Sequence, residues 1–166
     1  MKETATNPTY TTAELAELDS ISRQIDIDAS AATVWQLIAR PGWYINEGAV
    51  EDDVEVRREK DDQGCDIDVV VHPRLGEFYF RTVQQDKPRY AAYRWLGTPH
   101  REKTEGTLVE FWIDEREDGG VTLRVLESGF STVSDDPAVW LKEREGNDQG
   151  WSKELAAGRA WAEARS

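Results

Sequence analysis

The sequence predicts an α+β fold: an antiparallel sheet of about six to seven strands, with one face covered by a long C-terminal helix. Short segments between residues 21 and 125 alternate apolar and polar side chains, which is typical of strands with one buried face. The links between most of these segments are short and turn-like, as in antiparallel meanders. Residues 148–164 carry an apolar stripe at helical spacing that can cover the buried face.

The first part of the chain predicts a tail, a strand and a helix. Residues 1–12 are polar, so we expect a flexible N-terminal tail, followed by a single domain over residues 13–166. Thr11 and Glu14 have the spacing of a capping box, which allows a short helical turn after Thr11. Residues 21–28 alternate as a half-buried strand, and Ser30 then caps a helix that ends before residues 41–42 (Pro-Gly).

Six further strands follow, each with apolar residues on its expected inner face. These residues are Val54 and Val56; Ile67, Val69 and Val71; Phe78 and Phe80; Tyr93 and Trp95; Val109, Phe111 and Ile113; Val121, Leu123 and Val125. Asp66 and Asp68 are expected to point to the other face.

Two helices are predicted at the C-terminal end. A short one starts at Asp136 and Pro137 and ends near Leu141, and the longer one over residues 148–164 follows a break at residues 146–147 (Gly-Asn). Gly158 lies within the longer helix, where glycine costs about 1 kcal/mol against alanine. A close approach of this helix to the sheet would explain that glycine.

Composition excludes several classes of partner. The 166 residues carry a net charge of −13, so binding to nucleic acid or to an anionic membrane surface is not expected. Cys65 is the one cysteine, so no intramolecular disulfide can form. No apolar run approaches the ~20 residues needed to cross a bilayer, and the first residues carry no apolar signal core. A cytoplasmic location is therefore expected.

The order of these elements resembles the START-like helix-grip superfamily, also called Bet v-like or SRPBCC. Within it, the chain is similar to the branch named after the activator of the Hsp-90 ATPase. The resemblance covers about residues 21–161 and rests on residues 25–30 with 34–35, 76–80, 93–95, 119–120, 127–130 and 150–151. It differs at residues 30–31, where the family often has proline, and at residues 43–44, where Trp-Tyr follows a Pro-Gly pair. The resemblance implies a curved sheet wrapped around the C-terminal helix, with an apolar cavity between them.

Candidate ligand contacts are mainly aromatic side chains that parity directs to this interior. The cavity candidates are Arg23, Trp43, Tyr44, Phe78, Phe80, Tyr93, Trp95, Phe111, Phe130, Trp151 and Leu155. Apolar pockets with few polar groups are typical of small-molecule sites, but the same rings would also serve simply to fill a core. Tyr44, Tyr93 and Trp95 have polar tips, so we expect these three to orient a ligand.

Arg23 shares a strand face with isoleucines, and a buried guanidinium needs a partner. It either meets an anionic ligand group in the cavity or, as we prefer, lies near a strand end, extends its charged group into solvent, or pairs with one of the 33 acidic residues. His72 and His100 each adjoin a proline and are expected in surface loops, without zinc-site spacing. Cys65 is expected to be a small, partly buried thiol. The sequence contains no phosphate-binding glycine motif.

Three functions fit this pattern, and the first is preferred. The first is a binding protein for an apolar or aromatic small molecule, without metal, cofactor or assigned catalytic residue. The second is an enzyme of the cyclase or hydratase type in the same cavity, for which Arg23, Tyr44, Tyr93 and His72 are the candidate groups. The third is a co-chaperone-like interaction module, which predicts an exposed apolar patch and a basic partner surface.

Overall fold

The computed structural model describes residues 10–96 and 106–165. The helices are α1 (Thr12–Glu17), α2 (Ala31–Ile38) and α3 (Pro137–Glu163), with one 3-10 turn, η1 (Phe130–Thr132). The strands are β1 (Ser20–Ile27), β2 (Glu55–Lys60), β3 (Asp66–His72), β4 (Gly76–Asp86), β5 (Tyr90–Leu96), β6 (Thr107–Glu115) and β7 (Val121–Ser128). The predicted α+β class is confirmed.

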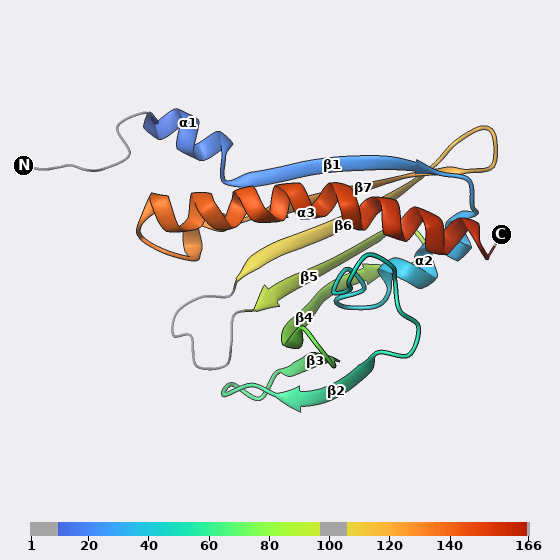
Figure 1. Cartoon of the computed structure of the whole chain (residues 1–166), viewed down its shortest axis with the longest axis horizontal. Helices are drawn as coiled ribbons and strands as arrows, with labels where there is room; N and C mark the ends of the chain where they lie inside the picture. The colour runs from blue at the N-terminus through green and yellow to red at the C-terminus, as the bar shows by residue number, and fades with distance from the viewer. Residues whose placement is uncertain (1–9, 97–105, 166) are drawn as a thin grey trace, which may run out of the picture.

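All seven strands form one curved antiparallel sheet in the order β1-β7-β6-β5-β4-β3-β2. Strands β2 to β7 are a meander, and β1 closes the other edge by pairing with β7, where Ile21 lies opposite Glu127. Helix α3 runs across one face of the sheet, and α2 lies near its C-terminal end (Figure 1). The sheet therefore grips the long helix as expected.

The helix starts follow the predicted capping residues. The Thr11 hydroxyl accepts from the backbone of Glu14, whose carboxylate accepts from the backbone of Thr11, so the capping box forms and α1 follows it. The Ser30 side chain caps α2, and the Asp136 side chain caps α3. The first helical turn is thus fixed locally in all three helices.

Strand β3 presents the opposite face from the one predicted. Asp68 pairs with Phe80 and Val70 with Phe78, and directly paired residues point to the same face of a sheet. Val70 belongs to the main core cluster, whereas Val69 is buried on the other face. Three consecutive valines make the alternation ambiguous here, so the prediction that Asp68 points away from the core face was wrong.

Helix α3 is one continuous helix of 27 residues, so the predicted break at residues 146–147 was wrong. Gly146 continues the helix because nothing in the fold demands a turn there. Gly158 does lie at a close approach, but to α2 and the following loop: a Cβ there would lie 3.0 Å from Leu37 Cδ2 and 3.1 Å from the Trp43 ring. The expected contact with the sheet is replaced by contacts with these two side chains.

Two smaller expectations were also wrong. Cys65 is exposed rather than partly buried, because it lies in the β2–β3 turn, one residue before β3. His72 is 2 % exposed rather than a surface residue, and His100 lies outside the described residues. Over the described part of the chain, no helix combines the length and apolar character needed to span a bilayer.

Candidate functional site

Aromatic rings occupy most of the interior between the sheet and α3. Phe80, Tyr93, Phe111 and Phe130 are fully buried. Phe111 packs 5.8 Å from the Trp151 ring, measured between centroids. These rings are packed against one another as core residues, so the space expected to be a large cavity is largely filled.

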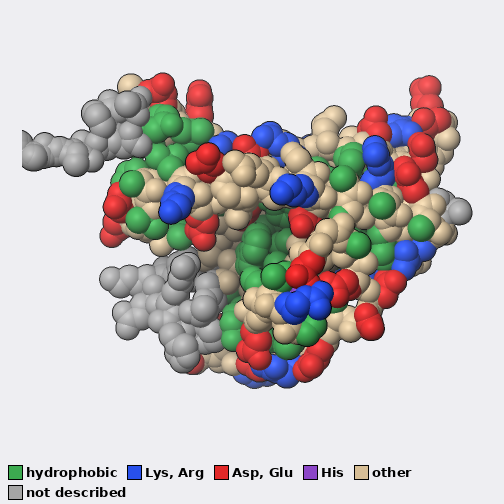
Figure 2. Space-filling model, viewed as in Figure 1, with side chains coloured by type: hydrophobic (Ala, Val, Ile, Leu, Met, Phe, Trp, Pro, Cys, Tyr) green, Lys and Arg blue, Asp and Glu red, His purple; other side chains and the backbone are tan. Residues whose placement is uncertain are grey.

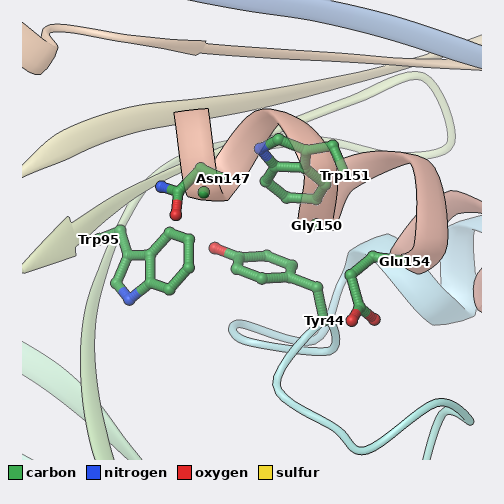
Figure 3. Close-up of a pocket in the computed structure, with 7 residues that line it drawn as sticks. Tyr44, Trp95, Asn147, Gly150, Trp151 and Glu154 are labelled. Carbon is green, nitrogen blue, oxygen red and sulfur yellow. The ribbon is translucent and has the colours of Figure 1, made fainter. Parts of the chain in front are cut away.

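A smaller pocket of about 130 Å³ remains where α3 meets the end of β5 and the loop after α2. Its lining consists of Tyr44, Trp95, Gly146, Asn147, Gly150, Trp151 and Glu154. In Figure 3 the Tyr44 ring lies between Trp95 and Glu154, with Trp151 above it. The space-filling view shows a hollow beneath α3 with hydrophobic side chains at its floor (Figure 2). Three of the predicted cavity residues thus line one pocket.

A tight turn places Tyr44 in this pocket. Gly42 has φ 71°, and a Cβ at this position would lie 2.7 Å from the Phe80 ring, so only glycine lets the loop pack against the sheet. The Ile45 amide donates to the Gly42 carbonyl at 2.9 Å, which closes the turn. The Pro-Gly pair therefore carries Trp43 and Tyr44 from the end of α2 into the interior.

The Tyr44 hydroxyl is buried, yet it makes no hydrogen bond within the described part of the chain. Tyr44 is 5 % exposed, and burial, with the nearby Glu127 carboxyl, raises the pKa of its phenol well above the usual value. Leaving a buried hydroxyl unpaired costs free energy. The Tyr44 hydroxyl therefore has unused hydrogen-bonding capacity beside the pocket.

Glu127 lies behind the pocket and was missed as a functional residue. It is fully buried at the end of β7, where Trp151 Nε1 donates to Oε1 at 2.8 Å and Thr107 Oγ1 to Oε2 at 2.5 Å. The Asn147 amide donates to both oxygens, at 3.2 and 3.1 Å. Burial raises the pKa of Glu127, and these hydrogen bonds act in the other direction. Glu127 lies two residues after the inward-facing Val125, so the alternation of the strand could have identified it as an inward-facing residue.

Glu154 is a second carboxyl that the sequence reasoning missed, and it lines the pocket itself. It accepts a hydrogen bond from Asn46 Nδ2 at 2.7 Å. Burial raises the pKa of Glu154 to about 7, against the lowering effect of that hydrogen bond. Its spacing of three and four residues from Trp151 and Gly150 places it on the same helix face, a signal that could have found it.

Two glycines form the α3 side of the pocket. Gly146 and Gly150 are four residues apart and therefore lie one above the other on one helix face. A Cβ built at either position meets nothing within 4 Å. The pocket exists partly because the helix carries no side chain at these two positions.

The remaining predicted cavity residues lie elsewhere. Arg23 forms an ion pair with Asp148 of α3, and its side chain is 43 % exposed. This agrees with the preferred interpretation, in which Arg23 does not reach a ligand in the cavity. The Tyr93 hydroxyl donates to the Ile38 carbonyl at 2.5 Å and accepts from Gln85. Phe78 packs at the margin of the core, and Leu155 is 2 % exposed within it.

Trp43 lines a different pocket, of about 310 Å³, between the loop after α2 and strands β2 and β3. Val56 and Val70 form its apolar wall, and Arg40 and Asp52 lie in its lining. Arg40 Nη2 donates to Asp52 Oδ1 at 3.0 Å. Of the predicted aromatic residues, three therefore line the pocket beneath α3, Trp43 lines this second pocket, and the others pack in or against the core.

His72 is the last residue of β3, and its side chain supports the β3–β4 turn. Its Nδ1 accepts the backbone N–H groups of Arg74 and Leu75, both at 3.1 Å. A neutral ring then carries its proton on Nε2, which lies 2.8 Å from Glu51 Oε2. Within residues 10–96 and 106–165, no three histidine, cysteine, aspartate or glutamate side chains gather as a metal-ion site would require.

Comparison with known proteins identifies the fold. No family model matches the sequence, and no curated protein matches it. The Aha1 dimer from Colwellia psychrerythraea is similar with a TM-score of 0.61 at 15% identity, covering 87% of this chain and 96% of that one. A protein from Mesorhizobium loti has a TM-score of 0.63 at 12% identity, covering 89% and 98%. XoxI from Bacillus cereus has a TM-score of 0.55 at 20% identity, covering 89% and 98%.

These similarities span nearly the full length of both chains. At sequence identities this low, they show a shared fold and nothing about function. The chain has the helix-grip fold, as the resemblance implied. Because one fold hosts many functions, the function has to be argued from the pocket.

Proposed function

We propose that this helix-grip protein binds a small molecule with a compact apolar or aromatic body in the pocket beneath α3. The observation that carries the proposal is the buried, unpartnered hydroxyl of Tyr44 in a pocket walled by Trp95 and Trp151. Small-molecule sites combine such apolar walls with a few polar groups that fix orientation. An engineered cavity of about 150 Å³ binds benzene, so about 130 Å³ suits one ring or a headgroup of that size.

The glycines of α3 support the same proposal. Glycine in a helix interior costs about 1 kcal/mol relative to alanine, and neither Gly146 nor Gly150 has a neighbour that would obstruct a methyl group. Local rules are broken most often where function requires it. A helix face kept bare above a pocket is consistent with space reserved for a ligand.

A thermal-shift screen against small aromatics, flavonoids and lipids tests the proposal. A ligand at one hundred times its dissociation constant adds about 2.7 kcal/mol of stability. Gly150→Leu should fold, because leucine is a good helix former, and should abolish the shift by filling the pocket. Ala156→Leu is the matched control, since residue 156 is on the exposed face of the same helix.

Hits that disappear in Gly150→Leu and persist in Ala156→Leu would support the proposal. A screen without any hit would contradict it, as would hits that bind Gly150→Leu unchanged.

A second candidate is an acid–base enzyme that uses the same pocket. It is favoured by Glu154, because a carboxyl whose pKa is raised to about 7 by burial exchanges its proton near neutral pH. Turnover of a neutral hit should then be lost in Glu154→Gln while its binding is kept. If the wild-type protein binds the compound but forms no product from it, the enzyme candidate is contradicted and the binding function is retained.

The interaction-module alternative has less support. It expects a contiguous exposed apolar surface, whereas the large hydrophobic side chains exposed among the described residues belong to separate elements. They are Tyr10, Val56, Leu75, Val83 and Val139.

A further inference from the structure

The electrostatic character of the pocket narrows the kind of molecule that fits it. Glu154 is the one charged residue in the described lining, which contains no lysine or arginine. Behind the wall, the Glu127 carboxyl is held by neutral donors: the Thr107 hydroxyl, the Asn147 amide and the Trp151 indole. Within the described residues, neither carboxyl has an ion-pair partner. An anionic ligand group would meet repulsion here, and a cation would meet attraction.

The aromatic walls of the pocket also favour a positively charged ligand. The Tyr44 ring centroid lies 5.1 Å from that of Trp95, with planes at 63°, and 4.8 Å from that of Trp151, with planes at 56°. At these distances the Tyr44 ring packs directly against both tryptophans, and the three rings together form one aromatic wall of the pocket (Figure 3). Aromatic faces attract ammonium groups, most strongly for tryptophan, and proteins use grouped aromatic rings to recognise quaternary ammonium ligands.

The Tyr44 hydroxyl adds an acceptor. A phenol oxygen both donates and accepts, so its unpaired lone pairs would receive an N–H of a protonated amine. With a net charge of −13, the chain also raises the local concentration of cations.

We infer that the pocket takes a small organic cation, a protonated or quaternary amine with apolar substituents, held against the wall formed by Tyr44, Trp95 and Trp151 and balanced by Glu154. The inference rests on the proposed function, because it assigns a ligand class to the same pocket. The pocket's size admits a trimethylammonium group or one protonated arylalkyl amine.

Pairs of probes that have nearly the same shape but differ in charge test this inference. Choline and 3,3-dimethylbutan-1-ol have the same shape, with a carbon atom in place of the charged nitrogen, and benzylamine and benzyl alcohol form a second pair. Binding is measured by ligand-observed NMR and by titration of backbone amide shifts, at pH 8 and 150 mM salt. In the wild-type protein we expect each cation to bind at least about tenfold more tightly than its neutral partner.

Variants locate the binding and separate pocket from surface. Glu154→Gln and Trp95→Leu should each weaken binding of the cationic probes several-fold. Glu154→Gln should change binding of the neutral probes little. Glu145→Gln removes the same charge from an exposed position of α3 and should change neither. Cation binding that survives in Gly150→Leu would place the cation on the acidic surface and overturn the inference.

The outcomes distinguish the inference from the proposed function. If neutral and cationic partners bind equally, or the neutral one binds more tightly, the pocket binds small molecules but the charge assignment is overturned. If neither pair binds while a neutral compound from the screen does, the charge assignment is likewise overturned. If no probe and no screened compound binds, both fail.

Discussion

The indole Nε1 of Trp151 donates a hydrogen bond to Glu127 Oε1 at 2.8 Å, which joins α3 to the end of β7 inside the core. Trp151 is 3 % exposed and Glu127 is fully buried. The same tryptophan also forms a wall of the pocket. One side chain therefore connects the packing of the long helix to the candidate site.

Trp151→Phe should lower the free energy of unfolding by about 1–3 kcal/mol, because it removes one donor from a buried carboxyl. Trp112→Phe is the control: Trp112 is partly exposed on the other face of β6 and packs near Arg124. Urea unfolding of both variants measures the difference. Equal losses in the two variants would show that the bond to Glu127 contributes nothing beyond ring size.

The glycines of α3 should respond to alanine in opposite directions. Gly146→Ala should raise stability by about 1 kcal/mol, because a methyl group meets no neighbour and helix propensity improves. Gly158→Ala should lower stability by about 1 kcal/mol, because Leu37 and the Trp43 ring are buried and have little room to move. Thermal unfolding of the two variants is the measurement, and a gain at residue 158 would contradict the close packing described there.

Removing the hydroxyl should affect the free energy of unfolding differently at the two buried tyrosines, Tyr93 and Tyr44. Tyr93→Phe should cost about 1–2 kcal/mol, because the Ile38 carbonyl and Gln85 lose a partner. Tyr44→Phe should be neutral or stabilising without ligand, because its hydroxyl makes no hydrogen bond within the described residues. Chemical denaturation compares them, and a large loss for Tyr44→Phe would mean that its hydroxyl is already satisfied.

Glu154 should make stability depend on pH near neutrality. Its pKa in the folded protein is raised to about 7 by burial, against about 4.5 in the unfolded chain. The folded state therefore binds the proton more tightly. This contribution to the stability of the fold is complete below pH 4.5 and is lost as the pH rises through 7. Glu154→Gln should therefore gain stability relative to wild type between pH 5 and pH 8, by about 1 kcal/mol after allowing for partial exposure. Glu145→Gln is the control, and parallel pH profiles for wild type and Glu154→Gln would contradict the raised pKa.

The sequence was sufficient for the fold wherever alternation was unambiguous. Strands β6 and β7 bury alternate residues as predicted, and Thr11, Ser30 and Asp136 cap the helices that follow them. It was insufficient for β3, where adjacent valines satisfy either parity and only pairing with β4 decides the face.

The candidate site was harder to predict, because it depends on which side chains leave space. Tyr44, Trp95 and Trp151 were among the expected residues, but an aromatic ring that fills a core and one that lines a pocket have the same pattern in sequence. The two carboxyls were passed over because glutamates are so common in this acidic chain. Alternation along β7 pointed Glu127 inward, but the donors that hold its carboxyl come from β6 and α3, which the sequence alone does not bring together.

The bare backbone at residues 146 and 150 has a practical consequence for protein engineering. A graded series of substitutions there, from alanine to leucine, would shorten the accessible depth stepwise without altering the sheet or the loop that carries Tyr44. Selectivity for molecular size would then be adjustable from a single helix, and the native pair of glycines would mark the most permissive member of the series.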